Sequence, residues 1–208
     1  MIALSSAYKE ALIGIEIDGK KAFKSMDANC KHSENLLLNI DKSLDEIGKT
    51  IQENDTYSVV VGPGSFTGLR IGIALVKGLL AGSKDEKKII SLTTFDLMAY
   101  SYITNNDAAE DFYCVINALS GLFYVCKYDK NGKKLEDERV IDGETLSSLQ
   151  GVKVSLSEEN VTEITIHPTC EELLSLSKLK AEKGEFIKES ELLPLYLRKS
   201  QAEMNLKD

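Results

Sequence analysis

The stretch VVGPGSFTGLRIG, residues 60–72, ends a run of β-branched residues and carries four glycines in its thirteen positions. A strand followed by a glycine-rich helix start can bind phosphate. Neither the nucleotide-binding pattern GxxxxGK with Ser or Thr after it nor the dinucleotide pattern GxGxxG fits this spacing, however. Ser65 suits the N-cap position of a helix, and the free N–H groups behind it leave an anion contact open. The other interpretation is that the glycines let a neighbouring helix approach closely.

The residues that follow predict a helix over 66–81 that is apolar on both sides, which is unusual for a helix at a protein surface. Each glycine inside a helix costs about 1 kcal/mol relative to alanine, so a compensating contact is expected. We predict close helix packing at Gly64, Gly68 and Gly72. The pattern leaves open whether the other face, which carries Phe66, Leu69, Arg70, Ile73 and Lys77, packs within the protein or binds a partner.

Two rounds of strands and helices run through the chain. In the first round, a meander of three strands falls within residues 2–26, with a hairpin turn predicted at Asp18-Gly19, and two further strands alternate with helices. The second round, residues 112–182, repeats that order without repeating the residues. Such a duplicated pattern predicts two copies of one fold, residues 1–104 and residues 105–208. Tandem units of this kind resemble the actin-like (ASKHA) fold, an α/β class in which each half is similar to ribonuclease H.

Few residues in the sequence are arranged for catalysis. The first strand of an actin-like kinase ends in an acidic residue that holds magnesium, whereas Ser5 and Ser6 stand at that point here. These serines are candidates for lining a nucleotide cleft, although turn residues after a strand are the simpler explanation. His32 and Ser33 invite a catalytic interpretation, but helix capping and solvation are simpler. We predict no catalytic residue, metal or cofactor; a small-molecule kinase or ATPase of this fold is the alternative function.

Composition narrows the classes of partner. The 208 residues contain 25 Lys and Arg against 33 Asp and Glu, a formal net charge of −8 at pH 7. Nucleic-acid and anionic membrane surfaces attract clustered cations, and only short pairs such as Lys87-Lys88 occur, so binding of either by this chain alone is disfavoured. Scattered cysteines and the lack of a long apolar run predict a soluble, cytoplasmic protein.

Four segments together resemble the TsaB (YeaZ) family, bacterial accessory proteins for the threonylcarbamoyladenosine modification of tRNA. The most specific is GPGSFTGLRIG at 62–72. The others are HSENLLL at 32–38, NALSGLFY at 117–124 and LPLYLR at 193–198. The chain departs from the family after the first strand, where Ser5-Ser6 replaces an acidic residue followed by Thr or Ser.

The resemblance implies an actin-like protein that lacks the metal-binding histidines of its catalytic relative, TsaD. It also implies a heterodimer with a TsaD-type subunit through the first-half helices, a homodimer through the same surface, and support for a TsaE-type ATPase. Transfer of the threonylcarbamoyl group to adenosine 37 of tRNA would belong to the TsaD-type subunit, so this chain would contact tRNA only indirectly. The interface is expected to include His32, Ser33, Leu36 and Leu37, and the residues that face outward from the glycine-rich helix: Phe66, Leu69, Arg70, Ile73 and Lys77.

Overall fold

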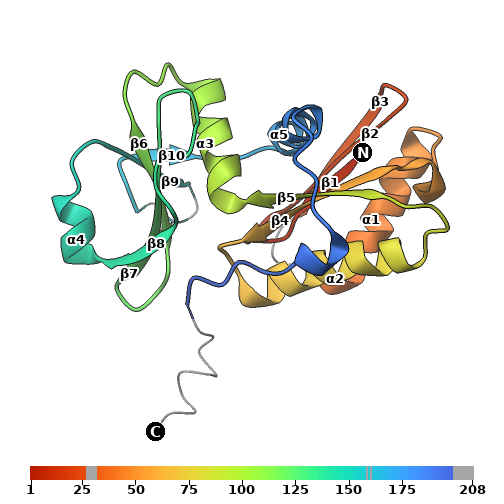
Figure 1. The fold of residues 1–208 in the computed structure, drawn as a ribbon, viewed down its shortest axis with the longest axis horizontal. Coiled ribbons are helices and arrows are strands. Elements are labelled where there is room, and N and C mark those ends of the chain that lie inside the picture. Colours follow the sequence, from red (N-terminus) through yellow and green to blue (C-terminus); the bar gives the residue numbers. More distant parts are fainter. Residues whose placement is uncertain (27–31, 158, 160, 199–208) are drawn as a thin grey trace, which may run out of the picture. The chain divides into compact units, whose positions relative to one another are not determined.

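The computed structural model describes residues 1–26, 32–157, 159 and 161–198, and the side chains of residues 32–34 lie outside this description. Two five-stranded sheets organise the chain (Figure 1). In each sheet, three antiparallel strands are followed by two strands that run parallel to the first of the three. The α/β topology duplicated in the sequence, and with it the predicted actin-like fold class, is confirmed.

The first sheet contains the predicted meander and two parallel strands beside it. Its central strands are buried at every position, because helices cover both faces. The hairpin turn predicted at Asp18-Gly19 is present, with both residues at positive φ, 51° and 77°. In spatial order the strands are β3 (Lys20–Met26), β2 (Ala11–Ile17), β1 (Ile2–Ser5), β4 (Thr56–Gly62) and β5 (Lys88–Thr93).

The second sheet repeats this order with different side chains. Its core on one face gathers Tyr113, Val115, Val125 and Leu146, all buried. Short strands at both edges limit the pairing surface that the sheet exposes. In spatial order the strands are β8 (Arg139–Asp142), β7 (Leu122–Tyr128), β6 (Phe112–Asn117), β9 (Val152–Leu156) and β10 (Ile164–Ile166).

Helices lie on both faces of the first sheet. α1 (His32–Glu46) and α2 (Phe66–Ala81) pack against one face, and α5 (Cys170–Glu182) covers the other (Figure 1). None of the helices in the described part of the chain is long and apolar enough to cross a membrane. The remaining helical elements are α3 (Thr94–Asn105), α4 (Gly143–Ser148) and the 3-10 helices η1 (Ile51–Glu53) and η2 (Glu189–Glu191).

α3 and α5 each pack outside the sequence repeat that contains them. α3 follows β5 in the first repeat, yet its Tyr102 contacts Phe112 of β6, with ring centroids 4.6 Å apart. Asp96 of α3 likewise accepts a hydrogen bond from the Tyr128 hydroxyl of β7 at 3.0 Å. α5 follows β10 in the second repeat, yet it packs on β1 and β2. Each repeat thus gives its last helix to the other sheet.

This exchange explains why the compact units differ from the two repeats. By contacts, one unit is Met1–Thr94 with Thr169–Leu195, and the other is Phe95–Pro168 with the described residues from Tyr196 onward. The subdomains predicted as 1–104 and 105–208 follow the repeated order of elements instead. We keep that boundary as a proposal about the duplication, because it assigns each helix to the strands that precede it in the chain.

Gly14 lets α5 lie directly on β2. A Cβ atom at this position would sit 2.8 Å from the Cys170 carbonyl oxygen and 2.9 Å from the Leu174 Cβ. A hydrogen bond deeper in the same unit also joins the helix to the sheet, because the Ser177 hydroxyl donates to the Ser58 Oγ at 2.8 Å. The close contact of a second-half helix with a first-half strand therefore depends on a missing side chain in the strand.

An ion pair between α5 and β2 makes stability depend on pH. The Lys178 ammonium donates to both carboxylate oxygens of Glu16, at 2.8 and 2.9 Å, and this contact lowers the pKa of Glu16. A carboxylate whose folded pKa is depressed contributes stability above its unfolded pKa, about 4.3, and loses it as the pH falls through the lower folded pKa. We expect Lys178→Met to lower the free energy of unfolding by about 1 kcal/mol at neutral pH.

Urea denaturation of the original protein and of Lys178→Met, between neutral pH and about pH 3, measures the difference between their free energies of unfolding. It should shrink as Glu16 becomes protonated, because the lysine then has no charged partner in the folded state. A difference of the same size at every pH would instead assign the effect to packing of the lysine stem on the sheet.

Candidate partner-binding surface

The amino end of α2 is occupied by the protein's own chain. Ser65 is the N-cap, as predicted, and its Oγ accepts a hydrogen bond from the Gly68 amide at 3.2 Å. The Ser65 amide donates to the Ala7 carbonyl oxygen at 2.7 Å, which fixes the segment after β1 against the helix start. Because these two N–H groups are used inside the protein, the anion-binding interpretation of the stretch loses support.

The glycines of α2 and of its N-terminal turn lie against the segment that follows β1. A Cβ atom at Gly68 would overlap the Ser6 carbonyl oxygen, and one at Gly64 would collide with that of Ala7. At Gly72 it would sit 2.5 Å from the Ser6 Oγ. The neighbour that comes close is therefore the chain between β1 and β2, not another helix as the sequence interpretation held.

Ser5 and Ser6, the candidates for a nucleotide cleft, are both buried, with 4% and 1% of their surface exposed. The Ser6 hydroxyl donates to the Gly68 carbonyl oxygen at 2.8 Å, so it joins β1 to α2. Neither side chain is at the surface of the protein. The residues that stand where a kinase would hold its metal serve here to pack one element against another.

The predicted outward direction of Leu69 and Ile73 is wrong. Leu69 is 1% exposed and Ile73 is 5% exposed, and Ile73 belongs to the core of the first sheet. Leu36 of α1, also expected at the interface, is 1% exposed in the same core. The physical reason is that both sides of α2 are apolar, and the side that packs on the sheet is set by the glycines, which bring Leu69 and Ile73 inward with them.

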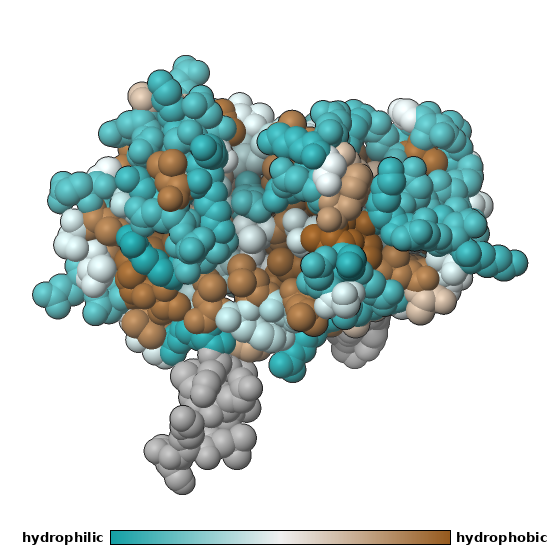
Figure 2. Space-filling model, viewed as in Figure 1, coloured by the Kyte–Doolittle hydropathy of each residue, from teal (hydrophilic) through white to brown (hydrophobic). Residues whose placement is uncertain are grey.

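The surface that α1 and α2 leave open consists of other residues. Leu37 and Leu38 of α1 are 43% and 47% exposed, and α1 lies next to α2. On α2, Ala74 is exposed and Gly78 has open space where a Cβ would be. Figure 2 shows hydrophobic residues near α2 on the side of the protein turned to the viewer. We call the following set the α1/α2 surface: Leu37, Leu38, Arg70, Ile71, Ala74 and Gly78.

The other predicted interface residues have mixed positions. Arg70 is exposed and belongs to the α1/α2 surface, whereas Phe66 and Lys77 are half-buried on the same helix. His32 and Ser33 begin α1, but their side chains lie outside the described residues. Leu38, Ile71, Ala74 and Gly78 were not among the interface residues predicted from the sequence. The spacing of a small residue at 74 and another at 78, one turn apart on α2, was the available signal.

Nucleophilic and metal-binding groups are sparse in the described part of the chain. Across residues 1–26, 32–157, 159 and 161–198, no group of three His, Cys, Asp or Glu side chains is placed to hold a metal ion. Cys114 and Cys126 are buried, and burial raises the pKa of the Cys126 thiol to about 12, which keeps it protonated at neutral pH. Ser157 and His167 approach each other at 3.4 Å on an exposed part of the second unit.

Comparison with known proteins is consistent with this arrangement. A family model described as TsaD: tRNA N6-adenosine threonylcarbamoyltransferase matches residues 25–183. The tRNA threonylcarbamoyladenosine biosynthesis protein TsaB of Escherichia coli (strain K12) is 32% identical over 104 residues, 49% of this chain and 44% of that protein. The Haemophilus influenzae protein of the same name is 27% identical over 99 residues, 48% of this chain and 41% of that protein.

The matched stretch thus spans less than half the length of these curated relatives. Among solved structures, YeaZ from Pseudomonas aeruginosa superimposes with a TM-score of 0.80 at 22% identity, covering 94% of this chain and 98% of that one. A second structure, described as similar to peptidase YeaZ from the same organism, gives 0.79 over 95% and 98%, also at 22% identity. The family model covers most of the chain, and the relatives and the fold agree with it, so the chain belongs to this threonylcarbamoyltransferase family and, within it, to the TsaB (YeaZ) proteins.

Proposed function

We propose that the protein is a non-catalytic scaffold subunit of the assembly that makes N6-threonylcarbamoyladenosine at position 37 of tRNAs. Its direct partner would be the TsaD-type catalytic subunit, bound through the α1/α2 surface. The observation that carries the proposal is that Leu37 and Leu38 are about half exposed on a helix whose opposite side is fully buried. Large apolar side chains side by side at a surface are typical of a site that a partner covers.

The start of α2 supports a role without catalysis. Where a phosphate-binding protein would present free N–H groups, Ser65 is bonded to Ala7 and Gly68 is capped by Ser65. The Ser6 hydroxyl is likewise used inside the protein. The catalytic chemistry is therefore assigned to the partner, and this chain would contribute the surface against which the partner is ordered.

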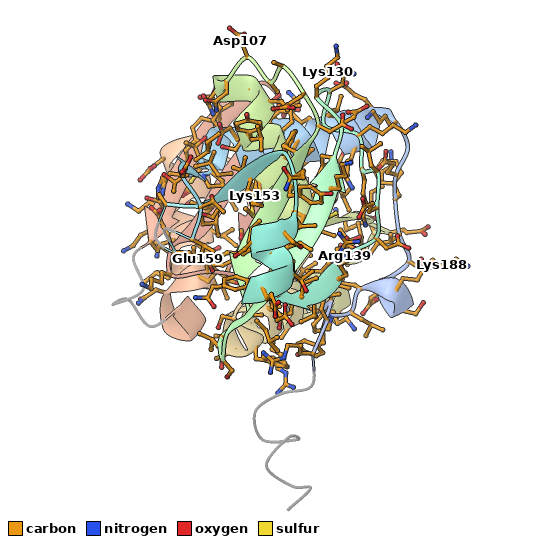
Figure 3. All side chains as sticks on the ribbon, turned by 90° about the vertical axis from the view of Figure 1, so that its left-hand side faces the viewer. Asp107, Lys130, Arg139, Lys153, Glu159 and Lys188 are labelled. Atoms are coloured by element: carbon orange, nitrogen blue, oxygen red, sulfur yellow. The ribbon has the colours of Figure 1, made fainter. Side chains whose placement is uncertain are left out.

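The charge distribution supports an indirect relation to tRNA. Lys130, Arg139 and Lys153 lie apart from one another in Figure 3 rather than in a basic patch. Arg139 is paired with Glu136 at 2.9 Å, which reduces its effect on a phosphate backbone. A net charge of −8 also opposes approach to a polyanion. The TsaD-type subunit would hold the tRNA. The other expected partners are a TsaE-type ATPase and a second copy of this chain, which would bind through the same helices as the TsaD-type subunit.

The light-scattering mass of the purified chain, alone and mixed with the TsaD-type protein of the same genome, tests the proposal. We expect a complex of one copy of each chain that forms at the expense of any homodimer, because both would use the α1/α2 surface. A chain that ignores the TsaD-type protein would contradict it. Magnesium-dependent release of phosphate from nucleotide by this chain alone would favour the actin-like kinase or ATPase instead.

A further inference from the structure

The turn between β6 and β7 adopts a backbone conformation that its residues disfavour. Leu119, Ser120 and Gly121 have successive φ angles of 63°, 55° and 75°, all in the left-handed region. Glycine adopts this region freely, but a side chain at Leu119 or Ser120 makes it unfavourable. A run of this kind persists only where the surrounding structure holds it in place. The turn also presents Leu119 to solvent, with 69% of its surface exposed.

The start of the turn is held from within the second unit. The Leu119 amide donates to the Asn117 Oδ1 at 2.9 Å, which fixes the entry into the left-handed run. The Asn117 amide in turn donates to a carboxylate oxygen of Glu159 at 2.9 Å, although Glu159 is far along the chain. Leu122 closes the turn by donating its amide to the Leu119 carbonyl oxygen at 3.1 Å. These bonds order the turn, but none of them binds the Ala118 carbonyl.

Arg198 makes that remaining contact. Its guanidinium Nη1 donates to the Ala118 carbonyl oxygen at 2.7 Å and lies 3.4 Å from that of Leu119. A charged donor within reach of two successive carbonyl oxygens favours the backbone conformation that brings both oxygens close to it. The residues just before the segment that carries Arg198 belong to the first unit, where Leu192 is fully buried and the Leu195 amide donates to the Val61 carbonyl oxygen at 2.8 Å.

We propose that Arg198 is a latch that holds the β6–β7 turn in its left-handed conformation, so that the presentation of Leu119 depends on the C-terminal segment. This contact links segment 117–124 to segment 193–198, although the two are far apart in the sequence. Displacement of residues 196–198 from the turn would release the strain at Leu119 and Ser120. Binding or cleavage of the C-terminal segment would then change a surface that is distant from it in sequence.

Amide hydrogen exchange of the full chain tests the latch. In Arg198→Ala, we expect the amides of Asn117, Leu119 and Leu122 to exchange at least about tenfold faster than in the original protein. The reason is that the turn opens more often when the Arg198 guanidinium no longer donates to the Ala118 carbonyl oxygen. Arg139→Ala is the matched control. It removes an arginine of the same unit that forms a surface ion pair with Glu136, and it should leave these amides unchanged.

The Leu119→Gly background separates release of strain from general loosening. Glycine takes the left-handed conformation without penalty, so Arg198→Ala should accelerate exchange by less than about threefold in that background. Equal acceleration in both backgrounds would overturn the latch, since it would show that Arg198 does not oppose backbone strain. So would exchange in Arg198→Ala that matches Arg139→Ala, or exchange that rises throughout β6 and β9, because the arginine would then be either irrelevant to the turn or a general stabiliser of the unit.

Discussion

Gly68→Ala is expected to lower the free energy of unfolding by about 3 kcal/mol or more, a large effect for one added methyl group. The methyl carbon would overlap the Ser6 carbonyl oxygen, which is backbone and cannot turn away as a side chain could. That backbone is also held in place on both sides. The Ser6 hydroxyl donates to the Gly68 carbonyl, and the next residue, Ala7, accepts from Ser65. Relief of the overlap therefore requires moving α2 away from β1.

Gly78→Ala is the matched control, because Gly78 belongs to the same helix but a Cβ there would meet nothing within 4 Å. Alanine has the higher helix propensity, so this variant should be as stable as the original protein or more stable by up to about 1 kcal/mol. Urea denaturation followed by circular dichroism measures both variants. If the two substitutions had equal effects, the close contact of Gly68 with the β1–β2 segment would not exist in solution.

Local features of the fold could be predicted because they depend on short stretches of sequence. The range predicted for the glycine-rich helix, 66–81, agrees with the observed α2, and the predicted N-cap Ser65 begins it. The Asp18-Gly19 turn could be predicted because few residue pairs adopt two successive positive φ angles. The repetition of strands and helices was enough to predict duplicated topology, since connections between such elements are restricted.

The direction in which α2 faces could not be predicted in the same way. A helix with apolar residues on both sides does not indicate which side is buried, and the choice is made by the depth of contact that glycine allows. The side with Gly68 and Gly72 also carries Leu69 and Ile73 into the core, which reverses the expected interface. Ala74 and Gly78 then lie on the exposed side of α2. Small residues such as these contribute little to a hydrophobicity pattern, so the pattern does not mark that side.

Contacts between segments that are distant in the chain could not be predicted from the sequence either. The packing of α5 on the first sheet depends on Gly14, but a single glycine in a strand can equally mark a bulge or a turn. The approach of Arg198 to Ala118 joins two stretches that were each recognisable alone, without any pattern to say that they meet. Single-sequence reasoning can identify such residues, but it does not pair them.

Two neighbouring residues of α2 are expected to respond in opposite ways to the same substitution. Ile73→Glu should abolish the cooperative unfolding transition, because Ile73 is 5% exposed and a carboxylate there would be buried without a partner at a cost of several kcal/mol, about 4 or more. Ala74→Glu should leave the melting curve unchanged, because Ala74 is exposed. It should nevertheless weaken association with the TsaD-type protein at least about tenfold, since the added charge would lose its water in an apolar contact.

Leu37→Glu on α1 provides an independent variant on the same surface and should behave like Ala74→Glu. Circular dichroism melts and titration calorimetry with the TsaD-type protein give stability and affinity separately for each variant. Normal affinity of both exposed-site variants would rule out the α1/α2 surface as the interface, even if Ile73→Glu unfolded as expected. A folded Ile73→Glu protein that failed to bind would instead indicate that Ile73 faces outward, as expected from the sequence. That result would contradict the packing of this side of α2 on the first sheet.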